Sequence, residues 1–152
     1  MSIEITSKGF EDNEELLQFI RENIDSHNKE MLYMLGESIV AEARSNLQNN
    51  TNINSGTLLS SIMILDEGDD YIIVGTREDY AGYIEYGRGP VRPLKEGGWL
   101  HWIDKSSGKD VFAKFANATE PMPFMEPAVI GITSDFPQVF IEETEKMFSK
   151  NG

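Results

Sequence analysis

Residues 74–89, which read VGTREDYAGYIEYGRG, end one strand-like run and contain a second, with turn residues around them. In the first run Ile72, Val74 and Thr76 fall on one face of an extended chain and their neighbours on the other. After a polar turn, residues 82–86 alternate in the same way. A period of two is typical of paired strands with one buried face. This stretch therefore predicts an antiparallel sheet.

Two helices are predicted before the sheet. Residues 13–25 carry an apolar face, and Asp12 and Glu15 have the spacing of a capping pair at its start. Residues 26–28, Ser-His-Asn, interrupt this pattern, and Asn28 can cap a second helix that runs to about residue 47. Its apolar residues recur every four positions, at Met31, Leu35, Ile39, Ala43 and Leu47. Such a stripe indicates a helix that faces the core.

Residues 48–56 are rich in Asn, Ser and Thr, which favour turns, and so end the second helix. Leu58 to Leu65 is then expected to be extended, with residues 66–70 as the hairpin connection to residues 71–76. Gly56 is expected to need a positive φ at this helix-to-strand turn. Gly36, within the second helix, suits either the close approach of another backbone or a tolerated glycine.

A second hairpin is predicted from residues 99–103 and 111–115, which flank a polar tip and can project from the body. Pro127 can occupy the first turn of a last helix that extends to about residue 148. Pro137 would lie inside that helix and kink or divide it.

These elements predict an α+β fold, with an antiparallel sheet packed against a long helix and a C-terminal helix, and with a projecting β-hairpin. A chain of 152 residues suits a single domain. Within it, residues 1–10 are expected to form an arm or an edge strand, and residues 90–120 a hairpin excursion.

The composition narrows the classes of function. The chain has no cysteine, which excludes disulfides and thiolate chemistry and suits a reducing compartment. The start has no pattern of a secretory signal, and no apolar run approaches the roughly 20 residues that cross a bilayer, so no membrane role is expected. The formal net charge of −13 repels phosphate and argues against tight DNA binding.

Residues 77–114 hold six acids and seven bases and are the least acidic part of the chain. The bases there are either simply solvated or face an acidic patch on a neighbouring subunit. The aromatic residues of the second hairpin either pack on the chain's own core or contact another subunit. The candidate interface residues are Arg77, Tyr83, Tyr86, Arg88, Arg92, Trp99, Trp102 and Phe112.

No catalytic, cofactor-binding or metal-binding residues are predicted. His27 and His101 lack a second histidine at metal-ligand spacing. His101 and Asp104 could be imagined as an acid/base pair, but no nucleophile motif accompanies them. Gly87-Arg88-Gly89 lacks the third glycine of a phosphate-binding loop and is followed by Pro90, so a strand-ending turn is expected.

Four motifs follow one another along the chain. They read NSGTLLSSI at residues 54–62, VGT at 74–76, YAGYIEYG at 80–87 and EPMPFMEPA at 120–128. In this order, and over roughly residues 30–135, they resemble a family of tailed-phage neck proteins. Asn54 and Ser55 depart from the acid and threonine usual in that family, and the proline common at the end of its preceding helix is missing.

The resemblance implies an α+β subunit of the virion that has no chemistry of its own. It would form a ring, as a hexamer or dodecamer, at the head-to-tail junction of a tailed phage or prophage-derived particle, after synthesis in the bacterial host cytoplasm. Its partners would be connector or head-closure proteins on one side and the tail terminator or tail tube on the other. DNA would pass through without specific binding, since cations are what bind phosphate. A tail terminator that caps the tail tube is the alternative role, and a small hydrolase a distant one.

Overall fold

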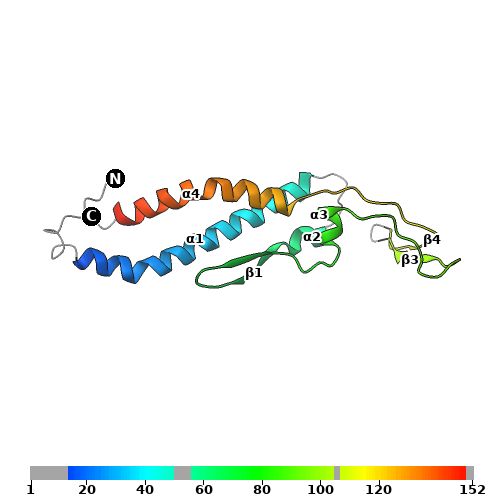
Figure 1. The fold of residues 1–152 in the computed structure, drawn as a ribbon, viewed down its shortest axis with the longest axis horizontal. Coiled ribbons are helices and arrows are strands. Elements are labelled where there is room, and N and C mark those ends of the chain that lie inside the picture. The colour runs from blue at the N-terminus through cyan, green and yellow to red at the C-terminus, as the bar shows by residue number, and fades with distance from the viewer. Residues whose placement is uncertain (1–13, 50–55, 105–106, 150–152) are drawn as a thin grey trace.

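The computed structural model describes residues 14–49, 56–104 and 107–149. Two long helices, α1 (Glu14–Asn49) and α4 (Met125–Ser149), run side by side in opposite directions along an elongated molecule (Figure 1). β1 (Met63–Glu67) and β2 (Ile72–Gly75) form an antiparallel hairpin against α1. A second hairpin lies at one end of the molecule. The predicted α+β fold is confirmed, although its strands form two separate sheets.

α1 is one continuous helix, so the predicted break at residues 26–28 is wrong. His27 does not leave the helix because its side chain packs between α1 and α4. It is 9% exposed, its Nε2 lies 3.0 Å from the hydroxyl oxygen of Thr144, and its ring lies 5.8 Å from that of Phe140. The Thr144 hydroxyl already donates to the Phe140 carbonyl, so Nε2 is the donor to Thr144. Packing on α4 outweighs the weak helix propensity of these three residues.

The main core lies where the end of α1 meets the short helices and the start of α4. α2 (Gly56–Ser61) occupies part of the segment that was expected to be extended. Leu58 in α2 and Ile62 directly after it are both fully buried, in the same core cluster as Ala43 and Leu47 of α1. Gly56 is the first residue of α2 and has no positive φ, so that prediction is wrong as well. The extended chain begins only at Met63.

The β1–β2 hairpin explains the glycine in the middle of α1. A Cβ on Gly36 would collide with the Ile72 side chain and lie 3.3 Å from Ile64 Cδ1. The glycine therefore admits strand side chains against the helix; the atoms that approach it closely are side-chain atoms and not the backbone that the sequence suggested. An irregularity between Ile64 and Asp66 shifts the register of the pair, as in a β-bulge.

α3 (Ala81–Tyr86) replaces the predicted third strand. Ala81 and Glu85 are buried, whereas Tyr83 and Tyr86 are exposed. Burial of two residues four positions apart is typical of a helix. An alternating pattern over only five residues is too short to distinguish a strand from a helix.

α4 confirms the predicted last helix, with Pro127 in its first turn. Pro137 lies in its interior, as predicted, and of the two expected effects, a kink or a division, the division does not occur because the helix continues through residue 137. The expectation for residues 1–10 falls outside the described residues.

Candidate functional site

Residues 88–119 leave the body of the molecule and return to it, and we call this segment the arm. It contains β3 (Leu100–Ile103) and β4 (Asp110–Ala113), which pair antiparallel as predicted. Nearer the body, isolated bridges join Arg88 to Thr119 and Val91 to Ala116. The arm projects beyond the start of α4, away from the opposite end of the two long helices (Figure 1).

The arm is attached to the body through Gly87, which has a φ of +73°. A Cβ at this position would lie 2.6 Å from the Thr119 carbonyl oxygen and 2.9 Å from the Pro121 nitrogen. Both are backbone atoms, which cannot move aside as the end of a flexible side chain can. Glycine is therefore required here, both for its φ and for the space.

Glu85 fixes the other side of the attachment. Its side chain is buried, yet it is a carboxylate that accepts three backbone hydrogen bonds at the start of α4. Oε2 accepts from the N–H groups of Phe124 (2.9 Å) and Met125 (3.0 Å), and Oε1 accepts from that of Glu126 (2.8 Å). The first N–H groups of a helix have no partner within it, and a negative charge is favourable there. Glu85 on α3 therefore caps α4.

Two further hydrogen bonds hold the same junction. The Met122 N–H donates to the Ile84 carbonyl at 2.8 Å, and the Asn46 side-chain amide of α1 donates to the Phe124 carbonyl at 3.1 Å. The YAGYIEYG and EPMPFMEPA segments thus meet in space, and together they set the direction in which the arm leaves the body.

The arm exposes an unusual amount of apolar surface. Trp99, Ile103 and Phe112 are each 61% exposed, and none belongs to the core cluster. Further exposed apolar side chains of the arm are Leu94, Trp102 and Phe115. Of the two alternatives for these aromatic residues, packing on the chain's own core is wrong.

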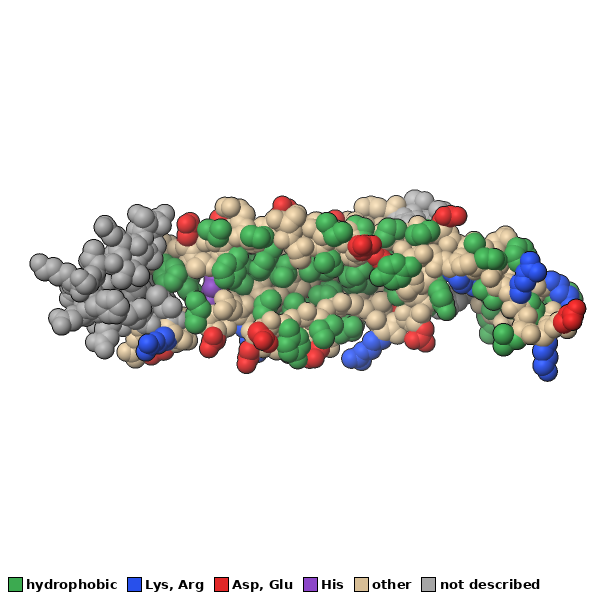
Figure 2. All heavy atoms as spheres, in the orientation of Figure 1, with side chains coloured by type: hydrophobic (Ala, Val, Ile, Leu, Met, Phe, Trp, Pro, Cys, Tyr) green, Lys and Arg blue, Asp and Glu red, His purple; other side chains and the backbone are tan. Residues whose placement is uncertain are grey.

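The charge of the arm is opposite to that of the body. It holds six of the chain's 13 lysines and arginines and three of its 26 acids, a net charge of +3 against −16 for all other residues. Lys114 Nζ lies 4.1 Å from the centre of a Trp99 ring and donates to the carbonyls of Gly97 and Gly98. Figure 2 shows basic and apolar side chains together at the arm end, with acidic side chains spread along the body.

The structure distributes the eight predicted interface residues over the arm and the segment before it. Arg92, Trp99, Trp102 and Phe112 lie exposed on the arm. Tyr83 and Tyr86 are exposed on α3, where the arm begins. Arg88 is half-buried at the first bridge, and Arg77 is exposed in the loop between β2 and α3.

Sequence reasoning missed the role of Glu85. It assigned the residue to a strand, in which neighbouring side chains alternate between faces. The available signal was a lone acid within an otherwise apolar and aromatic motif, followed later by a proline-rich helix start.

The histidine of the arm has a different partner from the one considered. His101 Nε2 lies 2.6 Å from Asp110 Oδ1 across the β3–β4 pair, and its ring stacks on Phe112 at 4.5 Å. The Asp104 carboxylate instead accepts from the Ser107 N–H. In the described parts of the chain, no three His, Asp or Glu side chains come together as metal ligands.

Residues 14–87 match the model of the HK97-gp10-like family, described as "Bacteriophage HK97-gp10, putative tail-component". This segment, just under half of the chain, is similar to that family, which confirms the resemblance to tailed-phage structural proteins. This similarity supports a structural role in a phage tail or neck, and such a role implies contacts with other virion proteins. Comparisons with curated proteins and with solved structures gave no match. None of the helices described has the length and apolar character needed to span a membrane.

Proposed function

We propose that this chain forms a ring at the head-to-tail junction, where it joins filled heads to tails and leaves a channel for DNA. The observation that carries the proposal is the arm, which is basic and apolar on a strongly acidic body. A two-stranded hairpin is marginally stable in water by itself, and surfaces of this kind mark contacts with other proteins.

The attachment of the arm supports the same proposal. The Glu85 cap, the two bridges and the close contacts around Gly87 hold the base of the arm in a defined direction. A contact surface held in this way loses less conformational entropy on assembly than a free loop would.

The charge of the body suits a passage for DNA. Residues outside the arm carry a net charge of −16, and a surface of that sign does not retain the phosphate backbone. DNA would therefore slide through a channel lined by the body. The arm's bases would be occupied by protein contacts.

Deleting the gene for this chain from the phage or prophage that encodes it tests the proposal. We expect DNA-filled heads and separate tails of normal length to accumulate, as seen by electron microscopy, because only the joining step is lost. Tails of irregular length would assign the chain to the alternative role of a terminator, since an uncapped tube continues to grow. A normal yield of joined particles would contradict both roles.

A further inference from the structure

The outward face of α4 is a second exposed apolar surface, on the body rather than on the arm. Ile130, Pro137 and Ile141 are exposed and recur at helical spacing, and the two isoleucines are 62% and 50% exposed. These residues face away from the side of α4 that packs on α1. An apolar stripe on the outside of the body is therefore open to a partner.

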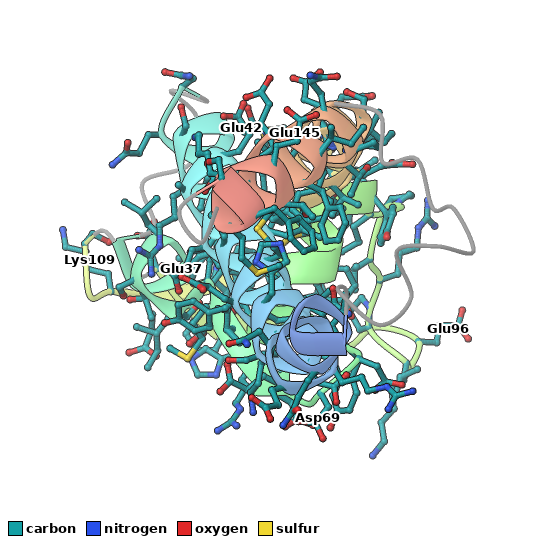
Figure 3. The ribbon with its side chains drawn as sticks, turned by 90° about the vertical axis from the view of Figure 1, so that its left-hand side faces the viewer. Glu37, Glu42, Asp69, Glu96, Lys109 and Glu145 are labelled. Atoms are coloured by element: carbon teal, nitrogen blue, oxygen red, sulfur yellow. The ribbon has the colours of Figure 1, made fainter. Side chains whose placement is uncertain are left out.

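The exposed surface of α4 around this stripe is acidic, and at about 3.6 residues per turn Glu126 and Glu145 lie nearest to the stripe. The exposed acids of α4 are Glu126, Asp135, Glu142 and Glu145. The helix has one base, Lys146, whose pKa is raised by its 2.6 Å hydrogen bond to Glu143. In the end view of Figure 3, Glu145 points outward on the same side as Glu42 of α1. The open face of α4 is thus apolar and negative, whereas the arm is apolar and positive.

We propose that the arm of one copy docks on the outward face of α4 of a second copy. The proposal rests on the proposed function, because it names the contact that would build the ring. Complementary charge and two exposed apolar surfaces on the same chain identify the second copy as the occupant.

The contact is made between copies because of the shape of the chain. The arm extends beyond the start of α4 (Figure 1), whereas Ile141 and Glu145 lie in the second half of that helix. At 1.5 Å per residue, Ile141 is roughly 24 Å along the helix from Met125, so the arm cannot fold back on it. Two different surfaces then meet in a head-to-tail contact, which closes into a ring when the rotation between copies allows it.

Charge-reversal variants of the two surfaces, produced singly and together during phage assembly, test this contact. The arm variant carries Arg92→Glu and Lys109→Glu, and the helix variant carries Glu142→Lys and Glu145→Lys; all four side chains are exposed. Each variant alone sets like charges against each other at every contact, and we expect joined particles to fall by at least tenfold. When both are produced together, each arm meets a helix of opposite charge, and the yield should recover.

The control variant carries Glu30→Lys and Glu37→Lys, which adds the same charge to exposed positions of α1. It should support joining alone and should not rescue the arm variant. Circular dichroism of each purified variant verifies that it folds.

The outcomes separate the two proposals. Loss of joining in the arm variant without rescue by the helix variant overturns the α4 contact and leaves the joining function intact. A helix variant that joins normally by itself overturns the contact too. Joined particles formed in the complete absence of the chain overturn the joining function and the contact with it.

Discussion

The capping of α4 by Glu85 gives the most direct prediction about stability. Glu85→Gln keeps the shape of the side chain and one acceptor oxygen. When that oxygen accepts from the Phe124 and Met125 N–H groups, the new amide NH₂ takes the place of Oε1, which lies 2.8 Å from the Glu126 nitrogen in the native chain. The NH₂ group then faces the Glu126 N–H. Two donors would then oppose each other in a buried site, and the charge that favours the helix start would be gone.

The size of the effect follows from these two losses. A buried N–H left without a partner costs about 1–3 kcal/mol. Removing a charge from the N-terminus of a helix costs about 0.3–1 kcal/mol when exposed and up to about 2 kcal/mol when partly buried. We therefore expect Glu85→Gln to lower the free energy of unfolding by about 2–4 kcal/mol. For a chain of this size that corresponds to a fall in Tm of roughly 5–12 °C.

Urea denaturation followed by circular dichroism measures the difference, and Glu126→Gln is the matched control. Glu126 lies in the first turn of the same helix and carries the same charge, but its side chain is exposed. Its replacement should cost less than about 1 kcal/mol. Equal and small effects for the two variants would refute the account of Glu85 as a buried cap.

Three further predictions follow from other positions. Gly87→Ala should lose at least about 2 kcal/mol of stability in thermal denaturation, because Gly87 has a positive φ and backbone atoms close to it. Gly56→Ala, the control, should be neutral or stabilising by up to about 1 kcal/mol. Equal effects would contradict the conclusion that the turn at Gly87 requires glycine. Gly36→Ala brings a Cβ against the Ile72 side chain, whereas Gly82→Ala has open space around it, and both gain the helix propensity of alanine. Gly36→Ala should therefore be less stable than Gly82→Ala by about 1–3 kcal/mol; equal stability of the two variants would argue against close packing of β2 on α1. The isolated chain should sediment as a monomer or weak oligomer, since the mixed-charge contact is modest alone; a ring that persists at the lowest measurable concentration would contradict this.

The sequence predicted correctly those elements that have a long apolar pattern or two independent signals. Apolar residues at every fourth position from Met31 to Leu47 identified most of α1. A proline-rich start followed by an apolar helical pattern identified α4. The two hairpins were marked by polar turns between strand-like runs. Their pairing is local along the chain, so no distant information was needed to predict it.

The errors occurred where packing between distant segments decided the local structure. His27 stays helical because α4 contacts it, and α3 forms because Glu85 reaches the start of a helix 39 residues later. In both cases the partner is too distant along the sequence to be identified from the residues around His27 or Glu85. The interface residues were selected by type, and their exposure on a projecting arm could be learned only from the fold.

Locating the chain in the assembled particle tests the central claim most directly. The sequence has no cysteine, so Ser60→Cys, at an exposed position of α2, provides a unique site for a gold label. Electron microscopy of labelled particles should place the gold in a ring at the junction between head and tail. Label distributed along the tail tube or confined to the distal tip would contradict the account.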